Sequence, residues 1–185
     1  FTLVEMLVAM VIGLIVLAGL YNLFATENKS FSVQEMTVEM QQNARAAMDM
    51  MVTEIQMAGY DPAALTSSGI ASAAANSIAF TQDLTGDGDL SDTHENITYT
   101  YDSANLRITR NTGSGNQPFA ENIEALNLSY YDEAGITTAT PADIKKIKIE
   151  IRVRTAKKDP NYGTNNGYRT YTLTSDVTPR NLAYP

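Results

Sequence analysis

The chain of 185 residues contains no cysteine and a single histidine, His94. Without cysteine no disulfide can form, so the folded part must be held together by side-chain packing or by a bound metal. A second histidine and a glycine-rich phosphate loop are also missing, and with them the common catalytic and nucleotide-binding arrangements. We therefore expect that the protein is not an enzyme, and we assign no catalytic role to His94.

Positive charge is scarce as well. Thirteen lysine and arginine residues face twenty-one acidic residues, which gives a net charge of -8 and a pI near 4.6. Nucleic-acid binding needs a basic surface that neutralises phosphates, and the sequence has no basic stripe of that kind. We therefore expect no direct binding of nucleic acid.

Proline and glycine are rare in the first third of the chain. Proline is absent before Pro62, and the only glycines before Gly59 are Gly13 and Gly19. Residues 1–25 are almost entirely apolar, and about 20 such residues in a helix cross a bilayer. Residues 26–58 continue with apolar side chains at steps of three and four, from Met36 to Ala58. The pattern predicts a membrane-spanning helix, an amphipathic continuation, and a head formed by residues 59–185.

Glu5 is the one charged residue in the apolar segment. An ionisable group inside a bilayer costs about 2.5–3.5 kcal/mol on insertion scales, so a partner is expected. Because the chain begins with Phe1 rather than methionine, we expect that it has been processed and that a free α-amine is that partner.

The run Phe1-Thr2-Leu3-Val4-Glu5, followed at once by a long apolar helix, resembles the mature N-terminus of type IV pilins and of the pseudopilins of type II secretion. The resemblance implies that a peptidase cuts before Phe1, whose amine is then N-methylated. It also implies that Glu5 pairs with the Phe1 amine of a neighbouring subunit. Gly13 and Gly19 are expected to mark a point where the helix loosens or a neighbour approaches closely.

Three further segments resemble the PilW family of minor pilins. They are residues 41–47 (QQNARAA), 56–62 (QMAGYDP) and 179–182 (PRNL). Many pilins staple a C-terminal loop with a disulfide, so this cysteine-free chain is expected to need another clamp for its last loop.

The densest group of polar residues lies at 83–95, DLTGDGDLSDTHE. Asp83, Thr85, Asp87 and Asp89 alternate around glycines as the oxygen ligands of an EF-hand-like calcium loop do. The twelfth position holds His94 instead of an acid, and Glu95 falls one place late. The flanks predict strands, so the site would be a calcium loop without EF-hand helices. The alternative is a solvated acidic turn between two strands.

The remainder of the head alternates apolar and polar residues, which predicts strands. We expect a strand at 78–80, a hairpin at 97–101 and 106–110, and strands at 125–131, 144–155 and 168–177. Residues 63–75 are predicted to be a surface linker and 119–123 a short turn. The fold class expected is therefore α+β: a long N-terminal helix packed on a C-terminal antiparallel sheet of about four to five strands, which is the lollipop shape that the pilin resemblance implies.

The polar face of the strand at 144–155 is cationic within an acidic protein, with Lys146, Lys148, Arg152 and Arg154 on one side. It would either contact an acidic surface of the next subunit, such as residues 83–95, or be a solvated outer face. The polar loop at 157–167 is expected to project from the sheet.

The leading expectation for function is a structural subunit of a type IV pilus or related extracellular filament. The alternatives are a minor or pseudopilin subunit for the tip or priming of a pilus or type II secretion system, and a calcium-dependent adhesive head. The resemblance implies other pilin subunits and the pilus assembly machinery as partners. It also implies a single-pass anchor in the inner membrane before assembly and a place in the filament on the cell surface afterwards.

Overall fold

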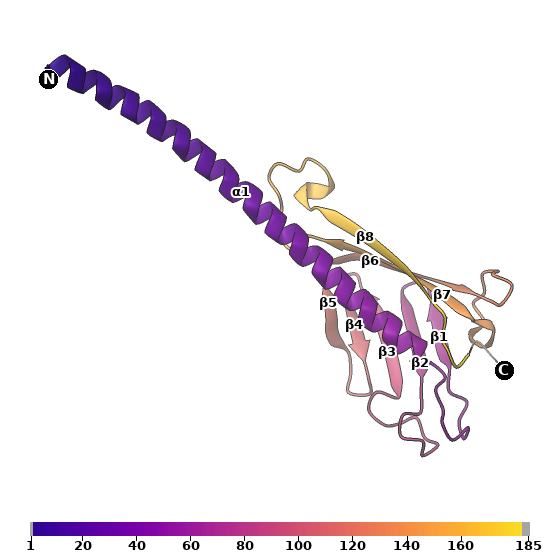
Figure 1. Ribbon diagram of the computed structural model, residues 1–185. Coiled ribbons are helices and arrows are strands. Elements are labelled where there is room, and N and C mark those ends of the chain that lie inside the picture. Colours follow the sequence, from indigo (N-terminus) through magenta and orange to yellow (C-terminus); the bar gives the residue numbers. More distant parts are fainter. Residues whose placement is uncertain (1, 183–185) are drawn as a thin grey trace. The chain divides into compact units, whose positions relative to one another are not determined.

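The computed structural model describes residues 2–182 as one long helix followed by a β-rich region (Figure 1). The helix α1 runs from Leu3 to Gln56. Eight strands and two short 3₁₀ helices follow: β1 (Ile70–Ala74), β2 (Ser77–Thr81), β3 (Asn96–Asp102), β4 (Arg107–Asn111), β5 (Gln117–Glu121), β6 (Ile123–Tyr131), η1 (Pro141–Asp143), β7 (Lys146–Arg154), η2 (Asn165–Gly167) and β8 (Thr170–Val177).

The chain divides into two compact units, one ending at Val38 and the other beginning at Glu39. The first unit is the N-terminal part of α1. The second contains the last part of α1 and all eight strands. The sequence predicts different boundaries, at residues 25 and 58, because it separates a membrane-spanning segment, an amphipathic helix and a head. Those boundaries stay a prediction.

The N-terminal unit is helical from Leu3 onward, and the helix continues through Gly13 and Gly19. A side-chain carbon added at either glycine would meet nothing within 4 Å. Both glycines therefore leave open surface on the helix of the single chain. Loosening of the helix at these positions within a filament stays a prediction.

The second unit contains two antiparallel sheets. One has five strands in the order β1-β2-β3-β4-β5, and the other has three in the order β6-β7-β8. The α+β class is confirmed, but the prediction of a single sheet with four to five strands is wrong. Two strands were missed: β1 lies in the predicted linker at 63–75, and β5 overlaps the predicted turn at 119–123.

Two tyrosine hydroxyls, one of buried Tyr130 and one of half-buried Tyr101, join the two sheets. The Tyr130 hydroxyl of β6 donates to the Ala74 and Ser77 carbonyl oxygens at 2.8 and 3.1 Å. The Tyr101 hydroxyl of β3 reaches the carbonyl oxygens of Ile123 and Glu124 in β6. Burial raises the pKa of Tyr130, so its hydroxyl keeps its proton and remains a donor.

The last part of α1 packs its apolar stripe into the same core as the strands. The buried stripe consists of Met40, Ala44, Ala47, Met48, Met51 and Ile55, with Ala58 just beyond the helix end. Met36, the first predicted member, is only half-buried. The alternation of β7 is confirmed too: its four apolar residues, Ile147, Ile149, Ile151 and Val153, are all buried.

One polar side chain of α1 is fixed against the five-stranded sheet. Glu54 accepts two hydrogen bonds from the Arg110 guanidinium of β4, from Nη2 to Oε1 at 2.6 Å and from Nε to Oε2 at 3.0 Å. The Tyr99 hydroxyl of β3 donates to the same Oε2 at 2.5 Å. Both charged side chains are only 16% exposed. This bidentate pair fixes the rotation and the height of the helix against the sheet.

Replacing Glu54 by alanine should lower the free energy of unfolding by about 2–3 kcal/mol, because half-buried Arg110 and fully buried Tyr99 would lose their acceptor. The measurement is chemical denaturation of the full chain in detergent micelles, followed by circular dichroism. Glu39→Ala removes an exposed glutamate from the same helix and is the matched control. Equal destabilisation by the two variants would contradict the assignment.

Candidate functional site

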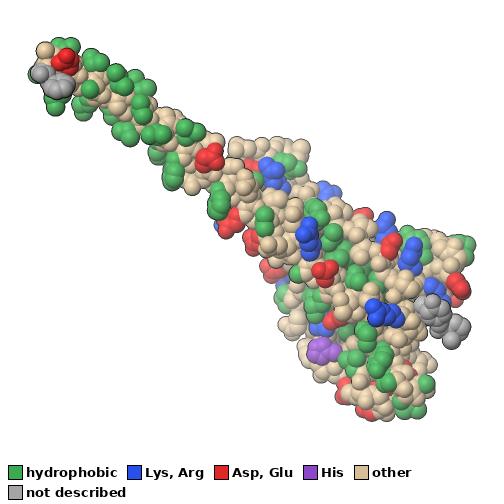
Figure 2. Space-filling view, in the orientation of Figure 1, with side chains coloured by type: hydrophobic (Ala, Val, Ile, Leu, Met, Phe, Trp, Pro, Cys, Tyr) green, Lys and Arg blue, Asp and Glu red, His purple; other side chains and the backbone are tan. Residues whose placement is uncertain are grey.

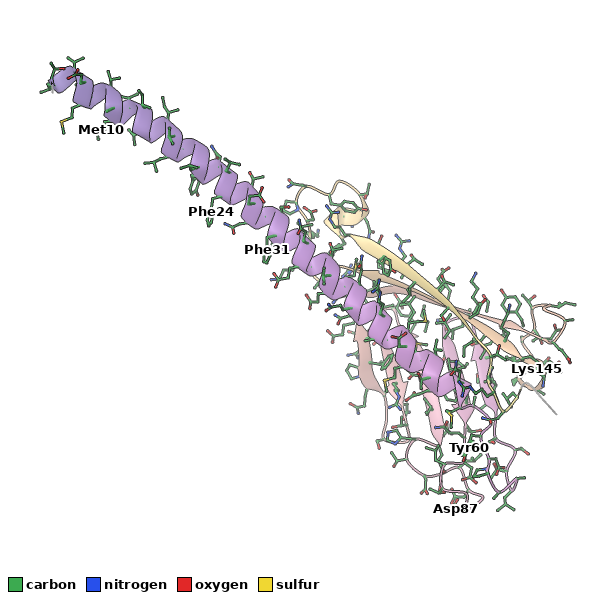
Figure 3. The ribbon with its side chains drawn as sticks, in the orientation of Figure 1. Met10, Phe24, Phe31, Tyr60, Asp87 and Lys145 are labelled. Atoms are coloured by element: carbon green, nitrogen blue, oxygen red, sulfur yellow. The ribbon has the colours of Figure 1, made fainter. Side chains whose placement is uncertain are left out.

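The N-terminal unit exposes an unusual amount of apolar surface. An 18-residue window of α1 has a mean hydropathy of 2.7, and none of it is buried. Figure 2 shows this surface as a succession of hydrophobic side chains along the N-terminal part of the helix, and Figure 3 shows Met10 and Phe24 projecting outward from it. Large apolar side chains more than half exposed here are Leu3, Val4, Met6, Leu7, Val8, Met10, Val11, Ile12, Leu14, Ile15, Val16, Leu17, Leu20, Tyr21, Leu23 and Phe24. Such a surface requires a lipid or protein environment.

Glu5 has only neutral partners in the described chain. Its Oε2 accepts from the Thr2 backbone N–H at 2.7 Å and from the Thr2 hydroxyl at 3.1 Å, and the Glu5 N–H donates to that hydroxyl oxygen at 3.3 Å. These reciprocal bonds form a capping box at the start of α1. They orient the carboxylate without neutralising its charge. The predicted partner amine belongs to Phe1, which lies outside the described residues.

The C-terminal tail closes over the end of α1 without a disulfide. Arg180 donates its backbone N–H to the Gln56 carbonyl oxygen at 3.0 Å. The Asn181 side-chain amide reaches the carbonyl oxygens of Met57 and Ala58 at 3.3 and 3.4 Å. These acceptors are among the carbonyls that a helix C-terminus leaves unpaired. We call this contact between residues 56–59 and 179–182 the tail clamp. It includes a bond from Lys145 Nζ to the carbonyl oxygen of Leu182, the last described residue.

Gly59 allows the tail clamp to form. Its φ of +79° lies in the left-handed region that ends many helices and that glycine adopts without strain. A side-chain carbon at this position would lie 2.6 Å from Leu182 Cδ2. The glycine is therefore required both by the backbone turn and by the closeness of the tail.

Replacing Gly59 by alanine should destabilise the fold by about 1–3 kcal/mol, through backbone strain and displacement of Leu182. Gly135→Ala is a matched control, because Gly135 also has a positive φ, +77°, but has open space around it. Thermal unfolding of both variants measures the difference. If Gly59→Ala loses no more stability than Gly135→Ala, the tail does not press on this position.

The acidic loop at residues 83–95 is more ordered than a solvated turn. Asp83 and Glu95 are both fully buried. Asp83 accepts from the backbone N–H groups of Gly86 and Gly88, and the Asp83 N–H donates to the Tyr60 carbonyl oxygen at 2.7 Å. The loop is therefore closed upon its first aspartate and joined to the segment that follows α1.

The outer part of this loop remains open to solvent. Thr85, Asp87, Asp89 and His94 are exposed, and Figure 3 places Asp87 at the far end of the loops beyond β2 and β3. The negative charges of Glu95, Asp87, Asp89 and Asp83 raise the pKa of Asp92, with Glu95 the strongest of them. Within residues 2–182, no group of three or more His, Cys, Asp or Glu side chains is placed to hold a metal. Calcium binding stays a prediction.

The neighbouring segment 61–66 supports the acidic loop. Asp61 accepts from the Thr66 N–H at 2.7 Å and from the Leu65 N–H at 3.2 Å. The Thr66 N–H is the main reason why the pKa of Asp61 lies below its ordinary value. A side-chain carbon at Gly88 would lie 3.1 Å from Leu65. The segment thus packs closely against the loop backbone.

Three of the four cationic side chains of β7 contact a residue of β6 or of the segment that precedes β8. Arg152 pairs with Glu124 at 3.1 Å, the Arg154 guanidinium lies 4.1 Å from the centre of the Tyr168 ring, and Lys146 Nζ lies 5.0 Å from that of Tyr131. Only the Arg152–Glu124 pair neutralises charge, and Arg152 remains 48% exposed, so the choice between a subunit contact and a solvated face stays open as predicted.

Sequence reasoning missed two features. The apolar spacing of residues 36–58 gives no role to Glu54, although it lies next to buried Ile55 and pairs with Arg110. The tail clamp was expected only as an unspecified replacement for a disulfide. Its signal was present, because two of the segments resembling PilW, 56–62 and 179–182, are the ones that contact each other.

Comparisons with known proteins agree with this geometry. Residues 1–21 match the prokaryotic N-terminal methylation motif, and residues 33–178 match the family of prepilin peptidase-dependent protein B. Among solved structures, the type IV-like pilin TTHA1219 from Thermus thermophilus is similar, with a TM-score of 0.52 and 13% identity over 79% of this chain and 100% of that chain. No curated protein sequence matches this chain.

The N-terminal motif and the helix packed on antiparallel sheets define a type IV pilin-like protein. Within that class, the chain belongs to the family of prepilin peptidase-dependent protein B. Pilin families are structural rather than enzymatic, and they interact with other pilin subunits and the assembly machinery. The apolar N-terminal helix is consistent with an inner-membrane anchor and with a place in a pilus.

Proposed function

We propose that the protein is a structural subunit of a type IV pilus or pseudopilus, assembled through its N-terminal helix. The observation that carries the proposal is Glu5, the one charge in an exposed apolar segment, whose described partners are both neutral groups of Thr2. A carboxylate moved into an apolar filament core needs a cation, since its burial unpaired is costly. The Phe1 amine of a neighbouring subunit supplies one.

The exposed apolar surface supports the same proposal. In the membrane, lipid covers the side chains of residues 3–24. After extraction, equivalent helices of neighbouring subunits cover them. Gly13 and Gly19 present bare backbone on this surface, which lets another helix approach closely. The helix thus leaves the lipid and enters a bundle of equivalent helices. The Glu5–Phe1 pair sets the axial position of each helix relative to its neighbour.

Glu5→Ala should leave the chain in the membrane fraction and reduce its amount in sheared filaments at least tenfold. The apolar segment is unchanged, but the pairing is lost. Glu5→Gln keeps an acceptor for Thr2 without the charge and should fail in the same way. Glu27→Ala, which removes an exposed acid of α1 beyond the apolar segment, should assemble normally. Normal incorporation of Glu5→Ala would refute the pairing mechanism.

The tail clamp favours a second, narrower candidate: a minor subunit of PilW type, acting at the tip or in priming. The two segments that form it are two of the three that resemble PilW. Quantitative mass spectrometry of the same sheared filaments distinguishes the roles, since a minor subunit is present at a few copies per filament and a repeating subunit dominates the sample.

A further inference from the structure

The acidic loop contains two fully buried carboxylates, Asp83 and Glu95, at its two ends. Asp83 is satisfied by backbone N–H groups of the loop, at 3.1 Å in the case of Gly88. All of its recorded donors are neutral. Burying a carboxylate with neutral donors alone is costly, because hydrogen bonds replace only part of its hydration.

Glu95 is less completely hydrogen-bonded than Asp83. Its Oε1 accepts from the N–H groups of Leu84 and Thr85 at 2.9 and 3.2 Å and from the Thr85 hydroxyl at 3.3 Å. The carboxylate is therefore aimed into the loop. Its other oxygen, Oε2, is buried and has no hydrogen-bond partner among the described residues. The Oε1 atom of Gln82 is likewise buried and has no hydrogen-bond partner among the described residues.

The surroundings add negative charge rather than positive charge. Asp87, Asp89 and Asp92 lie on the exposed part of the same loop. The four ion pairs found in residues 2–182 join Arg107 to Asp102, Arg110 to Glu54, Arg152 to Glu124 and Arg169 to Asp159. None of them includes an acid of the loop, so the charge of the buried carboxylates is uncompensated within the described chain.

We propose that the loop at residues 83–95 binds one calcium ion, with Asp83 and Glu95 as its buried ligands. The divalent charge balances the two carboxylates, and Glu95 Oε2 gains the partner it lacks. Thr85, Asp87 and Asp89, on the exposed side of the loop, are the candidates for further oxygen ligands. This step goes beyond the proposed assembly function and does not depend on it.

The ligand chemistry favours calcium over other cations. The available donors are carboxylate, hydroxyl and backbone oxygens, which suit hard cations rather than zinc or copper. The acids within residues 2–182 are not gathered into a ready-made metal group, so an ion bound here would complete its coordination with water or backbone oxygens. Calcium does so with six to eight oxygens, whereas magnesium requires a near-ideal octahedron. The competing explanation for the unpartnered Oε2 is a proton in place of an ion, and the Glu95→Gln variant separates the two.

The test uses the full chain in detergent micelles, stripped with a chelator. Equilibrium dialysis with radioactive calcium should give one bound ion per chain at low-millimolar calcium or below. Thermal unfolding followed by circular dichroism should shift upward by roughly 5 °C in saturating calcium, and by less than half of that in equal magnesium. Absence of saturable binding, or an equal shift with magnesium, would overturn the proposal.

Variants locate the ion. Glu95→Gln should weaken calcium binding at least tenfold, while Glu133→Gln, at an exposed glutamate of another turn, should bind as the wild type does. Wild-type affinity in a folded Glu95→Gln variant overturns the site. If Glu95→Gln unfolds at a higher temperature than the wild type whether or not calcium is present, Glu95 carries a proton instead of binding an ion. That result also overturns the calcium site. If Glu95→Gln does not fold, exposed Asp87→Asn decides: weaker binding supports the site, and unchanged binding refutes it.

Discussion

The packing of one helix face against two sheets is the constraint on which the folded unit depends. The stripe from Met40 to Ile55 forms part of the common core of the head, and the Glu54–Arg110 pair sets its rotation and height. A helix that turned by one residue would expose the stripe and bury the charged face. The same helix α1 also carries the exposed apolar N-terminal segment, so the stripe packed in the head and that segment are parts of one continuous element.

Cysteine is absent, and the structure shows how the chain end is secured without it. The tail clamp uses carbonyl oxygens left over at the helix end, a glycine in the left-handed conformation and the Leu182 side chain. Hydrogen bonds to these carbonyls satisfy groups that a buried helix terminus would otherwise leave unpaired. The clamp and the acidic loop meet the same short segment after α1, through Gly59 and Tyr60 respectively. The segment at the end of α1 therefore contacts both the C-terminal tail and the acidic loop.

Periodicity predicted what depends on local pattern. The long helix, its buried stripe, the β3–β4 hairpin and the alternation of β7 all follow from apolar spacing along the chain. The predictions were wrong where tertiary contacts, and not local sequence, determine the secondary structure. Strand β1 consists of alanine, serine and isoleucine, whose composition resembles a linker, and it becomes a strand by pairing with β2. Strand β5 contains Pro118 and lies at the edge of its sheet, where a missing N–H is tolerated. The contacts that join the two sheets, from the Tyr101 and Tyr130 hydroxyls to backbone carbonyl oxygens, link residues distant in the sequence and are not encoded in any local pattern.

Some residues of the candidate site could be predicted from the sequence and others could not. Glu5 stood out because a charge in an apolar run is rare, whereas the burial of Asp83 and Glu95 could not be read from an acidic sequence that equally suits a solvated turn. We propose that the N-terminal helix packs against other pilin helices in a filament, and a photo-crosslinking amino acid at Leu17, activated in sheared filaments, tests this packing. Crosslinks to the N-terminal segment of another subunit, identified by mass spectrometry, are expected. Recovery of the chain in filaments with crosslinks only to lipid or to head domains would contradict it.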